Sequence, residues 1–219
     1  MTVSELGAPG RKYRGAGPEQ RQQQRRARLV DAAIEEFGTR GYRNTTIDAV
    51  CARAGVGKRY FYESFDGSEG LLLAAYIVAT DRLRGTIIDG AAAGPGDLSP
   101  GDLSAVVHGS LTAFFRGIAE DPRIARIAFF EVLGIDPAVD ADYRRVIGSF
   151  VDTFLELAAP MIDIESIPPA RLRIIATGLV GAVLTIAQHW VLSDFRQPLD
   201  AVVDSAHTVL TSVLEGLGR

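Results

Sequence analysis

Residues 43–65, RNTTIDAVCARAGVGKRYFYESF, constrain the fold of this chain more than any other segment. Ile47, Val50 and Ala54 recur at spacings of three and four residues, which places them on one buried face of a helix. Gly55 follows where that helix must end, because glycine tolerates the left-handed conformation of a helix stop. The segment therefore predicts two short helices joined by a tight turn.

The second of these helices carries basic and aromatic side chains from its first residue. Its outward residues are Lys58, Arg59, Tyr60 and Tyr62. Phe61 and Phe65 lie four residues apart and are expected to pack inward. A helix, a tight turn and a second helix with donors near its N-terminus is the geometry that enters a major groove. The pattern predicts that this chain binds DNA.

Two threonines precede the first helix. We expect Thr45 to cap it, with Asp48 three residues later as the acidic partner of a capping box. Either Thr45 or Thr46 also offers a hydroxyl and a backbone N–H to a phosphate. The predicted DNA-binding residues are Thr45, Thr46, Lys58, Arg59, Tyr60 and Tyr62.

These side chains have different expected roles. Arg59 can grip guanine through two hydrogen bonds, and Lys58 contacts phosphate or guanine. Tyr60 can present its hydroxyl or ring edge to a base, and Tyr62 can donate to a phosphate. Two alternatives remain open: Tyr62 belongs partly to the core, or Tyr60 is a surface residue without a role in base readout.

Residues of several types recur at fixed spacing over residues 24–84. They are Phe37, Gly41, Thr46, Ile47, Ala54, Gly55, Val56, Tyr62, Phe65, Glu69 and Leu71. In this pattern the chain resembles the N-terminal domain of the tetracycline-repressor (TetR) family of bacterial regulators. Two positions depart from it. The family commonly has Ser where this chain has Gly57, and Lys where this chain has Ser68. Each departure puts one phosphate contact in question.

Charge is distributed unevenly along the chain. The net charge is −4, yet residues 1–65 hold 12 Lys and Arg against 7 Asp and Glu. A basic head on an acidic body fits a protein that presents one end to phosphates; a solvated basic tail is the alternative. The single cysteine, Cys51, excludes an intrachain disulfide and is expected to be a small buried hydrophobe.

The rest of the chain reads as successive helices without strand alternation, so we predict an all-α fold. Residues 1–17 are expected to form a disordered tail, 18–65 the helix-turn-helix domain and 66–89 a connecting helix opened by Asp66 and Glu69. Residues 90–101 read as a linker. Residues 98–219 are expected to form the effector-binding and dimerisation domain, with helices opened at Ser99-Pro100, Asp121-Pro122 and Asp136-Pro137.

The last two helices are strongly apolar. Residues 168–192 contain IIATGLVGAVLTIAQHWVL, which approaches the roughly 20 apolar residues of a membrane span. Gln188 and His189 near one end oppose that interpretation, so we expect a buried helix instead. The resemblance implies that the last two helices form a four-helix interface in a homodimer. The N-terminus shows no secretory signal, and a cytoplasmic location is expected.

The body contains aromatic residues that could wall an apolar ligand site. The predicted pocket residues are Phe114, Phe129, Phe130, Phe150, His189 and Trp190. His108, Arg126 and Gln188 are scarce polar groups near them in sequence. Ordinary core packing is the alternative for each aromatic. The resemblance implies a hydrophobic small-molecule effector, without identifying it.

Catalytic and metal-binding patterns find no support in the sequence. The chain has no Gly-rich phosphate loop or nucleophile elbow, and His108, His189 and His207 are isolated. We therefore expect no enzyme activity, cofactor or metal. The favoured function is a homodimeric DNA-binding transcriptional regulator, a repressor released by ligand from a palindromic site. The alternatives are an activator and an all-α protein-interaction module without DNA function.

Overall fold

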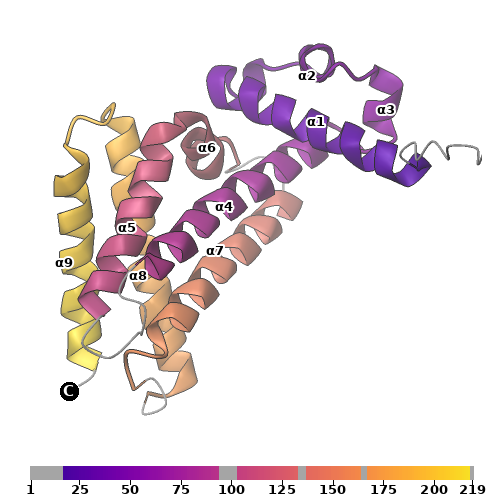
Figure 1. Ribbon diagram of the computed structural model, residues 1–219. Helices are drawn as coiled ribbons and strands as arrows, with labels where there is room; N and C mark the ends of the chain where they lie inside the picture. The colour runs from indigo at the N-terminus through magenta and orange to yellow at the C-terminus, as the bar shows by residue number, and fades with distance from the viewer. Residues whose placement is uncertain (1–16, 94–102, 133–136, 164–166, 218–219) are drawn as a thin grey trace, which may run out of the picture.

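The computed structural model describes residues 17–93, 103–132, 137–163 and 167–217, and every regular element within these ranges is helical. Four elements form the N-terminal part: α1 (Pro18–Arg40), the 3-10 turn η1 (Tyr42–Asn44), α2 (Ile47–Ala54) and α3 (Lys58–Tyr62). Helix α4 (Ser68–Ala92) runs diagonally from this part into the body (Figure 1). The predicted all-α fold is confirmed.

Six elements complete the body. They are α5 (Leu103–Glu120), α6 (Pro122–Arg126), the π-helical turn η3 (Ile127–Glu131), α7 (Pro137–Ala158), α8 (Pro169–Leu192) and α9 (Leu199–Leu217). Asp121 caps α6 by accepting a hydrogen bond from the backbone N–H of Arg123, and Pro122 occupies the first turn, as the sequence predicts. Helices α8 and α9 lie on the side of the body away from α1–α3 (Figure 1).

Helix α4 differs from its predicted bounds at both ends. It begins at Ser68 after Gly67, without a side-chain cap, so the predicted capping box of Asp66 and Glu69 is wrong. It continues to Ala92, and residues 90–92 of the expected linker are therefore helical. The remainder of that linker, with the predicted cap at Ser99-Pro100, lies outside the described residues, as do residues 1–16 of the predicted tail.

Helices α4 and α5 cross at a pair of glycines. A Cβ atom added to Gly90 would lie 2.5 Å from the carbonyl oxygen of Gly109, and one added to Gly109 would lie 2.6 Å from that of Gly90. Any side chain at either position would collide with backbone, so this crossing depends on glycine at both. The close approach fixes the C-terminal end of α4 against the body.

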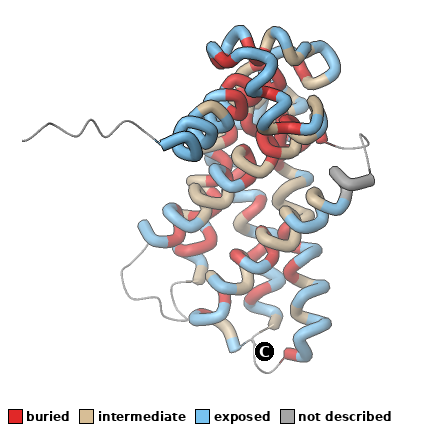
Figure 2. Tube along the Cα trace, turned by 90° about the vertical axis from the view of Figure 1, so that its right-hand side faces the viewer, coloured by how far each residue is buried: buried red, intermediate tan, exposed pale blue. Residues whose placement is uncertain are grey.

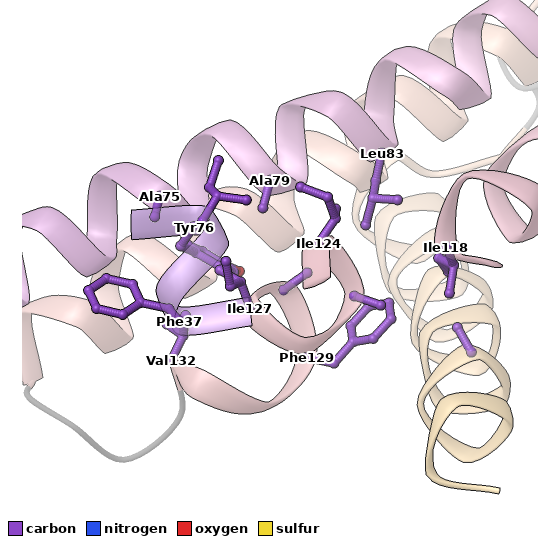
Figure 3. Close-up of a cluster of buried hydrophobic side chains, with 14 of the residues drawn as sticks. Phe37, Ala75, Tyr76, Ala79, Leu83, Ile118, Ile124, Ile127, Phe129 and Val132 are labelled. Atoms are coloured by element: carbon purple, nitrogen blue, oxygen red, sulfur yellow. The ribbon is translucent and has the colours of Figure 1, made fainter. Parts of the chain in front are cut away.

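One hydrophobic core continues from α1–α3 into the body. Figure 2 shows buried residues on the inward faces of helices in both parts of the molecule. At the junction Phe37 of α1 lies near Ala75 and Tyr76 of α4, with Ile127 of η3 beside them (Figure 3). All four are at most 2% exposed. Because α1, α4 and η3 share this cluster, a shift of α4 or η3 would also displace α1.

Candidate nucleic-acid interface and apolar cavity

The position of α3 is set by the turn before it and by one buried ring. Gly55 ends α2 in the left-handed conformation, at φ 61° and ψ 37°, and its amide bonds back to the last turn of α2. Val56 in the turn is 5% exposed, and Phe61 of α3 is fully buried, with its ring centroid 5.7 Å from that of Phe65. The inward packing of Phe61 and Phe65 is confirmed. These anchors turn the opposite face of α3 to solvent.

The outward face of α3 carries four side chains that can contact DNA. Tyr62 is 55% exposed and Tyr60 41%, and the Arg59 side chain is 88% exposed. Lys58 pairs with Asp48 at 2.9 Å, and Arg59 pairs with Glu63 at 3.1 Å. Exposed pairs of this kind contribute little, so a phosphate or a guanine edge can replace either carboxylate.

Helix α1 contributes to the same surface. The Arg25 guanidinium lies 4.3 Å from the centroid of the Tyr60 ring, and that of Arg26 lies 4.7 Å from the centroid of Phe65. Stacking on Arg25 holds the Tyr60 ring in place and brings a positive charge beside it. The contact of Arg25 with Tyr60 could not be predicted from the sequence, because the two residues are far apart along the chain.

The two threonines before α2 have different roles from those expected. Thr46 caps α2, because its hydroxyl accepts a hydrogen bond of 3.2 Å from the backbone N–H of Ala49. Thr45 donates its hydroxyl to the carbonyl oxygen of Gly41 at 2.9 Å. The predicted cap at Thr45 is therefore wrong. Thr46 is exposed and keeps its hydroxyl proton, so it is the better donor to a phosphate.

The body encloses an apolar cavity of about 90 Å³ among five helices. Its wall includes Ile87 from α4, Leu111 and Phe114 from α5, Phe150 from α7 and Val183 from α8. Helix α9 closes it with Leu210 and Leu214. Only two side chains in the wall carry a polar atom, Ser110 and Thr153. The arrangement suits an aliphatic or aromatic ligand and offers no charged partner.

A smaller and more polar cavity of about 20 Å³ lies beside the first, and both share Phe150 and Leu184. Tyr76 and Thr80 of α4 and Gln188 of α8 line it. Burial raises the pKa of Tyr76, with a further contribution from Tyr143, which stacks on it at 6.5 Å. The Tyr76 phenol therefore stays protonated, and α4 forms part of the wall of both cavities.

The predicted pocket residues divide into two groups. Phe114 and Phe150 line the apolar cavity, and Phe129 lines the smaller one. Phe130, His189 and Trp190 line neither, which corrects that part of the prediction. The Trp190 indole is buried and donates its N–H to the carbonyl oxygen of Gln197 at 2.9 Å, a structural bond. His189 is exposed.

The chain matches known proteins over most of its length. Residues 29–75 match the sequence profile described as bacterial regulatory proteins, tetR family. The HTH-type transcriptional activator FasR of Mycolicibacterium smegmatis is 27% identical over 177 residues, which cover 81% of this chain and 76% of FasR. The chain belongs to the TetR family of transcriptional regulators. The recognised relatives are regulators of transcription rather than enzymes.

Solved structures share the fold of this TetR-family chain. A TetR-like regulator from Rhodococcus sp. RHA1 superimposes with a TM-score of 0.62 at 21% identity, covering 88% of this chain and 96% of that one. FadR of Bacillus subtilis, solved in complex with stearoyl-CoA, gives a TM-score of 0.67 at 16% identity, covering 84% and 96%. At these identities the likeness shows the fold alone.

In this TetR-family chain the DNA-binding helices are tied to the body by an ion-pair network. Arg123 of α6 pairs with Glu35 of α1 and with Asp121, the latter at 2.7 Å. Arg126 bonds Glu131 at 2.7 Å and donates to the carbonyl oxygen of Thr39 at 2.9 Å. Arg126 therefore lies at the junction of the two parts and not in the ligand pocket, where its place in the sequence had suggested it.

The same network reaches the backbone that precedes α2. The second carboxylate oxygen of Glu131 accepts a hydrogen bond of 2.7 Å from the backbone N–H of Tyr42. The Tyr42 hydroxyl lies 3.0 Å from that of Ser68, the first residue of α4. Sequence reasoning missed these contacts because each joins residues that are distant along the chain. They connect η3, η1 and the start of α4.

An apolar surface is exposed along the last two helices. Ile174 and Leu192 of α8 are 73% and 72% exposed, and Val209 and Val213 of α9 lie one helical turn apart on its outer side. Within the described ranges α8 is the one helix with the length and composition to cross a membrane, and 22% of its most apolar stretch is buried. Its opposite side packs in the core through Ala176, Leu179 and Ala187.

Proposed function

We propose that this TetR-family regulator binds a palindromic operator as a homodimer, with α3 of each subunit in a major groove. The observation that carries the proposal is the outward face of α3, where Arg59, Tyr60 and Tyr62 project from a helix anchored by buried Phe61. Arg59 and Tyr60 would read bases, and Lys58, Tyr62 and Thr46 would bind phosphates. Lys58 and Arg59 exchange their carboxylate partners for the nucleic acid.

A homodimer also explains the apolar surface of α8 and α9. One helix of five residues contacts too few base pairs for useful specificity, whereas two subunits read half-sites about 34 Å apart. A second copy would cover Ile174, Leu192, Val209 and Val213 together. A membrane explains this surface less well, because the buried side of α8 is already occupied by its own core. This supports a cytoplasmic protein.

The dimer interface can be tested with two matched isoleucines. Ile174→Lys places a charge on the proposed interface, whereas Ile88→Lys changes an isoleucine of α4 that is 42% exposed. Light scattering of the purified proteins should give a monomer for Ile174→Lys and a dimer for wild type and Ile88→Lys. A dimer that survives Ile174→Lys, Leu192→Lys and Val213→Lys together contradicts the proposed interface.

We infer that the effector is a long-chain acyl compound. The apolar cavity supports this class, since its wall is aliphatic and aromatic with two hydroxyls. The related fold of Bacillus subtilis FadR was solved with stearoyl-CoA. The cavity of about 90 Å³ holds only part of such a chain, so an incoming ligand must push the surrounding helices apart. A ligand that fits only the expanded body has the differential affinity that a conformational switch requires.

The switch would act through α4 and η3. Ile87 of α4 lines the apolar cavity, while Tyr76 and Thr80 line the smaller one. At its other end α4 meets Tyr42, and η3 holds the Tyr42 amide through Glu131. Displacing α4 therefore moves α1 and, with it, the spacing of the two reading helices. A ligand-released repressor follows if the unliganded spacing fits the operator.

Selection of bound sequences from a random duplex pool tests the DNA-binding proposal. We expect an enriched palindrome with half-sites about one helical turn apart. The Arg59→Ala/Tyr60→Ala variant, run in parallel, should enrich no such site. Adding stearoyl-CoA to the selected complex should release wild-type protein. If the wild-type pool stays unenriched after any bound ligand has been removed from the protein, the proposed operator recognition is wrong.

Activation of transcription is the second candidate, and the similarity to FasR, a transcriptional activator, favours it. The two candidates predict opposite results in transcription with purified RNA polymerase from a promoter that carries the selected operator. A repressor lowers transcript yield, and stearoyl-CoA restores it. An activator raises the yield at the same operator.

A further inference from the structure

Ser110 is a polar residue of the apolar cavity whose hydroxyl has no hydrogen-bond partner. It lies midway along α5 between cavity residues Val107 and Leu111, and only 9% of its surface is exposed. Its Oγ atom is buried and makes no hydrogen bond. The other hydroxyl in the cavity wall, that of Thr153 on α7, belongs to a residue that is 4% exposed.

Several hydroxyls on the other helices of this protein bond to the carbonyl one turn earlier. Thr80 donates to Tyr76 at 2.8 Å, and Ser205 donates to Ala201 at 2.7 Å. That bond satisfies a helical hydroxyl within its own helix. Ser110 makes no such bond, and a buried hydroxyl without a partner costs about 1–3 kcal/mol. Such a group calls for a partner from outside the protein.

We propose that Ser110 is a specificity-determining residue whose hydroxyl donates to the carbonyl oxygen of an acyl ligand held in the apolar cavity. The inference rests on the proposed acyl effector and adds where its carbonyl lies. A purely aliphatic ligand leaves the Ser110 hydroxyl unpaired, as it is in the free protein. Its binding is stabilised only by burial of the ligand's chain. A ligand with an oxygen acceptor opposite the Ser110 hydroxyl gains a hydrogen bond for which water does not compete.

A carbonyl oxygen is shared by free fatty acids and by their thioesters, so the ligand could be either. The wall of the cavity contains no Lys or Arg that could neutralise a carboxylate. Burying an unpaired carboxylate is far less favourable than burying a neutral thioester carbonyl. The thioester is therefore the expected ligand, and stearate serves as the second arm of the test.

The test compares stearoyl-CoA with S-octadecyl-CoA, a thioether of the same chain length that lacks the carbonyl oxygen. Wild-type protein should bind the thioester about three- to tenfold more tightly, the range expected for one buried neutral hydrogen bond. Ser110→Ala should lose this preference for the thioester, because the substitution weakens binding of the thioester only. Ser104→Ala is the matched control, since Ser104 lies on the same helix outside the cavity, bonded to His207.

The stability of the unliganded variant separates a ligand contact from a structural role. Removing an unpaired hydroxyl should leave the thermal midpoint of Ser110→Ala unchanged or raised. A lowered midpoint would show that Ser110 bonds within the protein, and would overturn the proposal. Equal binding of the two CoA derivatives by wild type would also overturn it, while leaving the acyl effector in place. If wild type binds neither derivative nor stearate, the proposed effector class itself fails.

Discussion

The N-terminal helices and the helices of the body fill their interior space differently. In α1–α3 the Phe61 ring is fully enclosed, and the buried Glu36 carboxylate forms ion pairs with Arg53 at 2.5 Å and with Arg40 at 3.1 Å. In the body five helices surround a cavity, and the Ser110 hydroxyl in its wall is unpaired. A closely packed unit keeps one shape, whereas an underfilled one can exchange between arrangements.

This difference fits the two tasks proposed for the molecule. Reading base edges requires side chains fixed to within a fraction of an ångström, and α3 is fixed by apolar contacts and by Arg25 on Tyr60. Responding to a ligand requires a part that can change shape at low free-energy cost. The two parts should therefore respond differently to salt, to truncation of core residues, to surface mutation and to pH.

Salt should separate the two parts most strongly. DNA affinity should fall about 10³–10⁵-fold between 50 and 200 mM salt if the dimer neutralises roughly six to ten phosphates. Binding of the uncharged dye Nile red to the apolar cavity should change little over the same range, because no charged residue lines it. Fluorescence titrations measure both affinities. A flat salt dependence for DNA would favour a protein-interaction module over a regulator.

Truncation of one phenylalanine in each part tests the difference in packing. Phe61 and Phe114 are 0% and 1% exposed, so exposure alone predicts the same loss for both. Phe61→Ala should destabilise by about 3–5 kcal/mol. Phe114→Ala should lose about 1 kcal/mol less, because one side of its ring already faces empty space. Urea unfolding measures both values. Equal losses would show that the cavity is closed in solution.

Substitution of exposed residues on α3 should weaken DNA binding without changing stability or ligand binding. Arg59→Ala and Tyr60→Ala should each weaken operator binding about 10- to 100-fold, corresponding to one lost base contact. Their melting midpoints and affinities for stearoyl-CoA should equal those of wild type, because both residues lie on the surface far from the cavity wall. If both variants bind the operator as tightly as wild type, the docking of α3 is wrong.

The smallest predicted effect is that of pH on stability, through the Asp121–Arg123 ion pair at the junction of the two parts. Hydrogen bonds from Arg123 hold the pKa of Asp121 below its ordinary value. The folded form thus prefers the carboxylate, so its stabilisation is complete above about pH 4 and is lost as pH falls through the lowered pKa. Asp121→Asn keeps a capping oxygen without the charge. The unfolding free energies of wild type and variant should converge by about 0.2–1 kcal/mol between pH 6 and pH 3.

The helix-turn-helix region could be predicted from the sequence because the residues that determine its structure lie close together along the chain. The turn at Gly55, the inward Phe61 and the outward Arg59 all lie within a few residues, and periodicity alone places them. The choice between Thr45 and Thr46 as helix cap failed because adjacent threonines give the same signal, and a contact with Gly41 decides between them.

The cavity could not be predicted in the same way. Its wall combines α4, α5, α7, α8 and α9, and whether an aromatic residue faces it depends on how these helices rotate. Phe114 and Trp190 are both buried aromatics, yet only Phe114 reaches the cavity. The ion pair of Glu35 with Arg123 is likewise a contact between distant segments. The aromatic residues of the body indicated an apolar site, but the packing of the helices determines which residues line it.

The crossing of α4 with α5 at Gly90 and Gly109 makes α4 a lever with its fulcrum at one end. Ser68, where α4 meets the DNA-reading part, lies about 33 Å along the helix from Gly90 at 1.5 Å per residue. A rotation of about 5° at this fulcrum displaces Ser68 by about 3 Å, close to the rise of one base pair. In the proposed switch, widening of the cavity by a fraction of an ångström near Ile87, close to the fulcrum, is therefore amplified at the start of α4, beside the proposed DNA-reading part.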